Sequence, residues 1–210
     1  MKKYLEDLND SVFKVKLEGL LENFHYAFVE YQGGTLGHWG FDDGDATDRL
    51  NASKLCAAAF LVADGDILGK GDRSETLNAE LKERFHLLSS KEIENLLPLS
   101  IIEETAKRIF KRKKSKTTIE LEVDDISKIL QRPVSDSQYG IGYHLDICLG
   151  LQGKGKSTRR VFADESGTIN DKVKFCREAI EVMDSTDWVL PDTIEELCRK
   201  IYAHIMVFNH

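Results

Sequence analysis

The sequence predicts an α/β fold, with a parallel sheet flanked by helices and a helical appendage at the C-terminal end. Short apolar runs that suit buried strands alternate with segments of helical periodicity along the first half of the chain. The final part instead contains two long amphipathic segments and no apolar run of strand type. Alternation of this kind is typical of parallel sheets, in which helices connect successive strands.

The first elements are expected before residue 55. Residues 2 to 9 have the spacing of a helix, and no capping residue precedes it, so we expect the chain to begin inside an element. Phe24 to Tyr31 is rich in aromatic residues and is followed by Gly33-Gly34, which predicts a strand and a turn. A short helix is expected from about Asp45 to Lys54.

The stretch Ala57 to Asp66 predicts both a strand and a site. Seven apolar residues in a row, from Ala57 to Ala63, are too few for a helix and favour a strand that is buried on both faces. The run ends at Asp64 and Asp66. Residues i and i+2 of a strand lie on the same side, so both carboxylates are expected beyond the carboxyl end of the strand, where open α/β sheets bind ligands.

A second acidic pair follows the next predicted strand. Ser74 to Arg84 has helical spacing with Ser74 as a plausible N-cap, Phe85 to Leu88 is a short strand, and a helix opens at Ser89 and reaches Leu97. Glu92 and Glu94 lie just after this strand. Because the carboxyl ends of parallel strands lie on one edge of a sheet, the four carboxylates are expected to meet there. Hard oxygen ligands favour Mg²⁺, Mn²⁺ or Ca²⁺ over Zn²⁺.

The second half of the chain is predicted to be mainly helical. Pro98 interrupts one helix, and an amphipathic helix resumes from Ser100 to Phe110. The further expected elements are a helix from Asp124 to Gln131, a strand from Tyr143 to Leu149, and helices from Asn170 to Met183 and from Pro191 to Phe208.

Composition and charge limit the class of protein. The 210 residues suffice for one domain with a real core, and no apolar run approaches the roughly 18 residues of a membrane span. The start shows no signal peptide, so we expect a cytoplasmic protein that does not contact a membrane. The cysteines form no CxxC pair, which argues against a zinc site and a disulfide framework; they are Cys56, Cys148, Cys176 and Cys198.

The net charge of −7 argues against a passive nucleic-acid coat protein, but basic residues cluster locally. One block includes Lys107, Arg108, Lys111, Arg112, Lys113, Lys114 and Lys116, and a second includes Lys154, Lys156, Arg159 and Arg160. Such blocks are usually solvated surface. Beside an acidic metal site, contact with a phosphate backbone is the alternative.

Several of these segments together resemble a known family. Four segments occur in the order found in the TOPRIM domain of OLD-family (overcoming lysogenisation defect) nucleases. They are the strand with its Gly-Gly ending, the Asp64-Gly65-Asp66 element, the segment Glu92-Ile93-Glu94-Asn95 and the helix start Asp171 to Cys176. The resemblance covers most of residues 1 to 98 and about 168 to 210. It implies a TOPRIM-like core at 1–98, a basic insertion at 99–167, and C-terminal helices at 168–210 that return to the core.

The resemblance implies a Mg²⁺- or Mn²⁺-dependent DNA endonuclease that cleaves or nicks phosphodiesters, often in defence against phage. Asp64 and Asp66 would be metal ligands, Glu94 or Glu92 a further ligand or a water-orienting carboxylate, and Lys172 would neutralise the scissile phosphate, with Lys174 as the substitute. The expected partners are DNA and an ATPase domain or subunit, and a homodimer is compatible with the sequence.

The chain departs from the family in two respects, because residues for the first metal-binding glutamate and for the ATPase domain are absent. It would therefore be the carboxyl portion of a larger or split system, or a version with weakened catalysis. The runner-up function is a non-catalytic assembly or DNA-binding module with an incomplete metal site. Glu30 ends a predicted strand too, but its context matches the second strand of the family rather than the first.

Two other motifs suggest different chemistry. Gly150 to Ser157 satisfies the G-x-x-x-x-G-K-S pattern of a phosphate-binding loop and would follow a strand, but the sequence after it has no helical stripe, so a basic or solvated loop is the better interpretation. His144 and Asp146 would share one face of the expected strand, but no serine or cysteine nucleophile lies in a recognisable elbow nearby.

Overall fold

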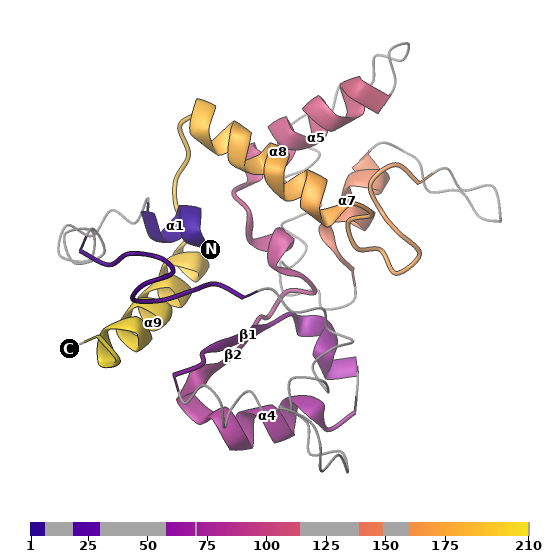
Figure 1. The fold of residues 1–210 in the computed structure, drawn as a ribbon. Helices are drawn as coiled ribbons and strands as arrows, with labels where there is room; N and C mark the ends of the chain where they lie inside the picture. Colours follow the sequence, from indigo (N-terminus) through magenta and orange to yellow (C-terminus); the bar gives the residue numbers. More distant parts are fainter. Residues whose placement is uncertain (7–18, 30–57, 70, 114–138, 149–159, 210) are drawn as a thin grey trace. The chain divides into compact units, whose positions relative to one another are not determined.

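The computed structural model describes residues 1–6, 19–29, 58–69, 71–113, 139–148 and 160–209. These parts form a mixed α/β protein (Figure 1). In chain order, the elements are α1 (Lys2–Glu6), β1 (Leu61–Ala63), the 3₁₀ helix η2 (Gly65–Gly69), α4 (Arg73–Leu81), η3 (Lys82–Arg84), β2 (Phe85–Leu87), η4 (Ile93–Leu96), α5 (Leu99–Lys113), α7 (Ile141–Cys148), α8 (Lys172–Ser185) and α9 (Asp192–Val207).

The described residues form two compact units. The first consists of the described parts of Met1–Ala63, Ile67–Leu87 and Asp192–His210, and the second consists of those of Asp64–Asp66 and Leu88–Pro191. The expected division into 1–98, 99–167 and 168–210 does not coincide with these units and stays a prediction.

The first unit contains a two-stranded parallel sheet. Leu61 of β1 pairs with Phe85 of β2, and Ala63 pairs with Leu87. The crossover between the strands contains α4, which lies alongside them in Figure 1. Leu77 and Leu81 of α4 are buried against the sheet, because residues four apart lie on one face of a helix. The parallel pairing and the helical crossover were both expected from the sequence.

Helices α1 and α9 pack against each other in the first unit. α9 buries one stripe at helical spacing, formed by Ile194, Leu197, Cys198, Ile201, Tyr202 and Ile205. Both helices were predicted from this periodicity. The described part of the first one ends at Glu6, and residues 7–9 of the prediction lie outside the described ranges.

The second unit is built on α5 and α8, which lie side by side (Figure 1). Ile102, Ala106 and Ile109 of α5 form a core with Phe175 of α8 and with two residues of α7, Ile141 and Leu145. Pro98 precedes the first turn of α5, and its carbonyl accepts hydrogen bonds from the N–H groups of Ile101 and Ile102 at 2.9 and 3.0 Å. The amphipathic helix expected after Pro98 is therefore confirmed.

The described basic side chains of the two blocks have acidic or backbone partners. Lys107 and Arg108 form i,i+4 ion pairs on α5 with Glu103 and Glu104, and Arg160 donates to the carbonyl of Asp164 at 3.0 Å. Pairs of this kind are usual on solvated helix faces. DNA contact by the basic blocks stays a prediction, because most of their side chains lie outside the described part of the chain. These are the side chains of Lys111, Arg112, Lys113, Lys114, Lys116, Lys154, Lys156 and Arg159.

The strand predicted from Phe24 to Tyr31 is wrong where the chain is described. Asn23 adopts a left-handed backbone with φ of 65°, and its N–H donates to the carbonyl of Tyr26 at 2.6 Å, so the chain turns here. Phe24 is 82% exposed, whereas a buried strand would cover its aromatic residues. Tyr26 forms an isolated bridge with Glu22 and belongs to no described strand.

The strand predicted from Tyr143 to Leu149 is also wrong, because residues 141–148 form α7. His144, Leu145 and Asp146 are consecutive and all buried on this short helix. The strand before Asp64 is shorter than predicted and begins at Leu61. Ser74 is not the N-cap of α4; Asp72 occupies that position without a side-chain cap hydrogen bond.

Other expected features fall on residues that the structure does not describe. They are the helices at Asp45 to Lys54 and Asp124 to Gln131, the loop Gly150 to Ser157, Glu30 and Cys56. The three described cysteines are free thiols, as expected, and Cys198 is buried.

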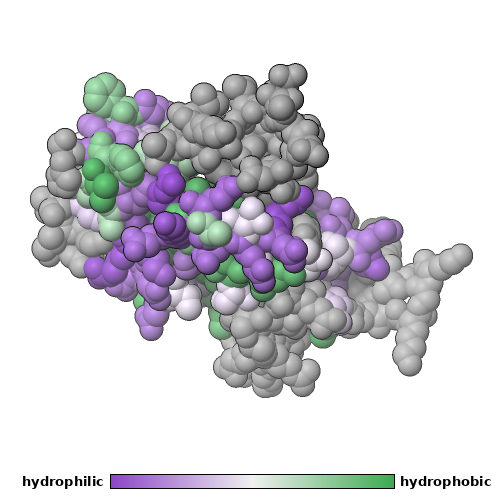
Figure 2. Space-filling view, turned by 90° about the horizontal axis from the view of Figure 1, so that it is seen from below, coloured by the Kyte–Doolittle hydropathy of each residue, from purple (hydrophilic) through white to green (hydrophobic). Residues whose placement is uncertain are grey.

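One face of the described part is largely polar: seen from below in Figure 2, hydrophilic side chains cover much of it. Glu75, Asn78 and Glu80 of α4 are exposed. Among the described helices, none combines the length and apolar character needed to cross a bilayer.

Candidate functional site

Asp64 leaves the end of β1 and is held by the segment that follows β2. The N–H of Gly65 donates to the carbonyl of Ser90 at 2.9 Å, and the N–H of Ile93 donates to Asp64 Oδ1 at 3.0 Å. A Cβ at position 65 would lie 2.9 Å from the carbonyl oxygen of Leu88, which is closer than real Cβ atoms come. Glycine is therefore required for this close approach.

Asp66 is arranged differently from the prediction. The strand ends at Ala63, and Asp66 lies in the first turn of η2, so the i,i+2 rule for strands does not place it beside Asp64. Its charge nevertheless acts on Asp64, whose pKa it helps to raise.

Glu92 and Glu94 belong to the segment that enters η4, and both are buried. Glu92 is 0% exposed and Glu94 is 5% exposed. Glu92 Oε1 accepts the N–H of Ile141 at 2.9 Å, and Asn95 Oδ1 accepts the same N–H at 2.9 Å. These two side chains thus satisfy a donor in the first turn of α7 that has no partner within the helix. Glu92 and Asn95 are therefore buried where they meet the first turn of α7.

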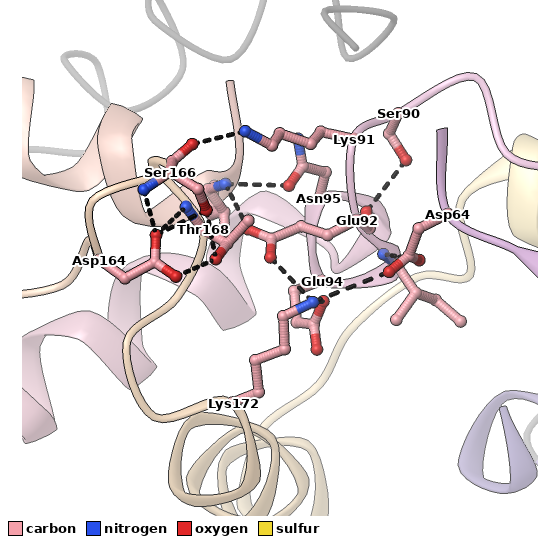
Figure 3. Close-up of polar contacts among 12 residues, drawn as sticks. Asp64, Ser90, Lys91, Glu92, Glu94, Asn95, Asp164, Ser166, Thr168 and Lys172 are labelled. Atoms are coloured by element: carbon pink, nitrogen blue, oxygen red, sulfur yellow. Dashed lines mark hydrogen bonds and ion pairs between the residues drawn. The ribbon is translucent and has the colours of Figure 1, made fainter. Parts of the chain in front are cut away.

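Lys172 reaches these carboxylates from the first turn of α8 (Figure 3). Asp171 caps the helix, because its Oδ1 accepts the N–H of Lys174 at 3.1 Å. Lys172 Nζ lies 3.1 Å from Glu92 Oε2, 3.3 Å from Glu94 Oε2 and 3.8 Å from Asp64 Oδ2. The structure therefore brings together Asp64, Glu92, Glu94 and Lys172, which we call the carboxylate–lysine cluster.

The position of Lys172 decides between the two lysines considered from the sequence. Lys172 is the one whose ammonium group contacts the carboxylates, whereas Lys174 is exposed and lines a shallow surface depression with Val173 and Arg177. Lys174 is therefore a suitable control for substitutions of Lys172.

The electrostatics of the cluster are dominated by burial. Burial raises the pKa of Glu92 to about 7, against the opposing effect of Lys172. The pKa of Asp64 is also raised by burial, and Glu94 and Asp66 act in the same direction. Burial alone would lower the pKa of Lys172, but Glu94, Glu92 and Asp64 outweigh it and raise that pKa. The ammonium form is thus strongly favoured.

The cluster partly fits a divalent metal ion. Its carboxylate oxygens are the hard donors that Mg²⁺ and Mn²⁺ prefer, and the buried oxygens Glu92 Oε2 and Glu94 Oε2 have no hydrogen-bond partner of good geometry. Their contacts with Lys172 are ionic. In the described ranges, however, no three His, Cys, Asp or Glu side chains stand ready to hold a metal ion together. The carboxylate oxygens are thus of the right type for a divalent ion, but in this structure they surround the ammonium group of Lys172.

Sequence reasoning missed Cys176, which lies one turn beyond Lys172 on α8. Its thiol donates to Glu94 Oε1 with a sulfur to oxygen distance of 3.7 Å. Burial, together with the charge of Glu94, raises the pKa of this thiol to about 12, so it stays protonated at neutral pH. The sequence did contain one signal for this contact: the i,i+4 spacing of Lys172 and Cys176, which places both on one face of a helix.

The turn of residues 164–168 lies beside the cluster (Figure 3) and was also missed. Asp164 Oδ1 accepts the N–H groups of Ser166 and Thr168 at 2.8 and 3.0 Å, and Lys91 donates to the carbonyl of Ser166. Lys91 precedes Glu92, so this contact fixes the acidic segment to the turn.

His144 and Asp146 do not form a catalytic pair. On α7, residues two apart point in different directions, so the shared face predicted from a strand does not exist. Asp146 is buried and accepts the N–H groups of Val161, Phe162 and Ala163 at 3.0 to 3.3 Å. It therefore anchors the chain that follows rather than serving chemistry.

Comparison with known proteins adds no family to these observations. No protein-family model, no curated protein and no solved structure matches the chain. Function is therefore inferred from the cluster itself and from the resemblance seen in the sequence.

Proposed function

We propose that this chain is a divalent-metal-dependent DNA endonuclease module with a TOPRIM-like fold, of the type found in OLD-family ATPase-nucleases. The observation that carries the proposal is the carboxylate–lysine cluster. Asp64 follows β1, Glu92 and Glu94 follow β2, and Lys172 begins a helix much later in the chain, yet one ammonium group lies within 3.8 Å of all three carboxylates. The sequence resemblance assigns metal and phosphate chemistry to the same residues.

Each residue has a distinct role in this proposal. Asp64 and Glu94 would hold Mg²⁺ or Mn²⁺, with Asp66 joining from η2. The bound ion would supply an activated water and would stabilise charge on the phosphate. Glu92 would orient the site, because it joins Lys172 to the N–H of Ile141 in α7. Lys172 would neutralise the scissile phosphate, since its ammonium form is favoured.

The wider functional setting comes from the resemblance alone. We propose DNA as substrate, an ATPase domain or subunit as partner, a cytoplasmic location, and phage defence or DNA processing as the process. A homodimer is compatible with this setting. The basic blocks at 107–116 and 154–160 would contact the phosphate backbone.

The proposal is tested by incubating the purified chain with supercoiled plasmid and Mg²⁺ or Mn²⁺. We expect nicking or linearisation that chelation abolishes and that Asp64→Ala, Glu94→Ala and Lys172→Ala reduce by at least 100-fold, on the order of the loss seen for one electrostatic catalytic group. Lys174→Ala is the matched control and should retain activity. Equal activity in the Lys172→Ala and Lys174→Ala proteins would contradict the proposal.

The second candidate is a non-catalytic assembly or DNA-binding module that keeps the fold. It is favoured by the presence of a lysine ammonium where a metal would otherwise neutralise the carboxylates, and by the lack of a ready metal set in the described residues. A folded chain that binds DNA without cleaving it, and that shows no Mn²⁺ binding, would favour this candidate.

A further inference from the structure

Among the described residues, Lys172 is the counter-ion that contacts all three carboxylates of the cluster. Lys172 Nζ is 3.1 and 3.3 Å from the buried oxygens of Glu92 and Glu94 and 3.8 Å from the more exposed Asp64. We propose that a divalent cation binds this site by displacing the Lys172 ammonium group, which is thereby released toward a phosphate group. This inference rests on the proposed function and adds a coupling between metal binding and lysine release.

The geometry supports this displacement. Mg²⁺ binds oxygen at about 2.1 Å, so an ion bound to the Glu92 oxygen that now faces Lys172 would lie within about 5 Å of its ammonium nitrogen. Two cations at this distance in a partly buried site repel each other strongly. The ion and the ammonium group therefore compete for the same oxygens.

Lys172 is the group of the cluster that can move. Glu92 is fixed by its hydrogen bond from Ile141, and Asp64 is fixed by its hydrogen bond from Ile93. Lys172 has a long flexible stem at the start of α8, and 39% of its side chain is exposed. The lysine can therefore swing into solvent without disturbing the two acidic segments.

The buried carboxylates need a cation beside them. Glu92 and Glu94 are buried, and a buried carboxylate without a nearby cation is costly. In the metal-free protein, Lys172 supplies this positive charge and holds the carboxylate oxygens of Glu92 and Glu94 in position. A divalent cation would take over this role, which leaves the lysine free for an anionic substrate.

The first test measures Mn²⁺ affinity by titration calorimetry on the full chain. Lys172→Met removes the competing charge and keeps the length of the side chain, so we expect Mn²⁺ to bind at least about 10-fold more tightly than in the wild type. Lys172→Arg keeps a cation and should bind no more tightly than the wild type. Lys174→Met is the matched control on the same helix and should leave the affinity unchanged.

The second test needs no substitution, and it remains valid if Lys172→Met does not fold. The wild-type protein is treated with an amine-acylating reagent with and without Mn²⁺, and modification of Lys172 is compared with that of Lys174 by mass spectrometry. We expect Mn²⁺ to accelerate acylation of Lys172 several-fold and to leave that of Lys174 unchanged. Na⁺ at the same ionic strength should have no such effect.

The outcomes separate this inference from the proposed function. Equal Mn²⁺ affinity in wild-type and Lys172→Met proteins, or Mn²⁺ binding without a change in Lys172 acylation, would overturn the displacement alone. Absence of Mn²⁺ binding in the folded wild type and in the folded Lys172→Met protein would overturn both the displacement and the metal-dependent nuclease.

Discussion

Glu92 Oε1 accepts the backbone N–H of Ile141 at 2.9 Å, while Oε2 of the same carboxylate faces Lys172 at 3.1 Å. One buried side chain therefore joins the first turn of α7 to the ammonium group at the start of α8. Each helix depends on Glu92 for part of its position, so substitutions here are expected to affect stability as well as any chemistry.

Glu92→Ala should destabilise the protein clearly. The substitution removes one of the two acceptors of the Ile141 N–H and the carboxylate that faces Lys172, and it leaves a cavity; such losses cost about 2–3 kcal/mol together. For a chain of this size the melting temperature should fall by roughly 5–10 °C, which thermal unfolding followed by circular dichroism can measure. Glu165→Ala, at an exposed position, should leave it nearly unchanged. Equal melting temperatures for the two variants would contradict this role.

Gly140→Ala should disrupt the same contact from the other side. A Cβ at this position would lie 2.9 Å from Glu92 Cδ and 2.9 Å from the carbonyl oxygen of Gly167, and it would be closer still to Glu92 Oε1. Overpacking of this kind costs typically 1–3 kcal/mol, which urea unfolding would detect. Gly69→Ala is the control, because nothing lies within 4 Å of its added Cβ. A Gly140→Ala protein as stable as the control would disprove the close packing.

Stability should decrease as pH rises through the titration of Glu92. The pKa of Glu92 is raised from 4.5 to about 7 in the folded state, so the folded protein holds this proton more tightly than the unfolded chain. The stabilising contribution is present in full below about pH 4.5 and is lost as pH approaches 7, with an upper bound of about 3 kcal/mol. Urea unfolding at several pH values should show this slope, and Glu92→Gln should flatten it. An identical slope in both proteins would refute the assignment.

Two of the cysteines should react slowly in the folded protein. Burial raises the pKa of both Cys176 and Cys198 to about 12, with Glu94 contributing at Cys176, so neither forms much thiolate at pH 8. Iodoacetamide labelling followed by mass spectrometry should modify both sites only after addition of urea. Rapid labelling of Cys176 in the native protein would show that its thiol is not held against Glu94.

The elements that sequence predicted well are those with strong periodicity. α5, α8 and α9 each bury one face of a long helix, and β2 is a short apolar strand after a helix. α7 was missed because eight residues are too few to show a helical period, and its position depends on contacts between Asp146 and residues 161–163. The turn at Asn23 was missed because aromatic residues dominate the sequence around it.

The candidate site was predictable in its members but not in its arrangement. Asp64, Glu92 and Glu94 were predicted because acidic residues that follow parallel strands often form a site. Lys172 was predicted from the family resemblance. The roles of Asn95, Ile141 and Cys176 depend on tertiary contacts between distant segments, which spacing does not encode. Likewise, the strand ends at Ala63, three residues before Asp66, so Asp66 lies on η2 rather than on an extended chain.

The carboxylate–lysine cluster is proposed to cleave phosphodiesters with a divalent metal ion. The most direct measurement is the rate of conversion of supercoiled plasmid to nicked product in Mn²⁺ by the wild type, Asp64→Asn and Asp72→Asn. Asp72 is a matched acidic control, since it lies at the start of α4 without a side-chain cap hydrogen bond. We predict loss of nicking in Asp64→Asn alone; equal rates in all three folded proteins, or no Mn²⁺-dependent nicking by the wild type, would contradict the claim.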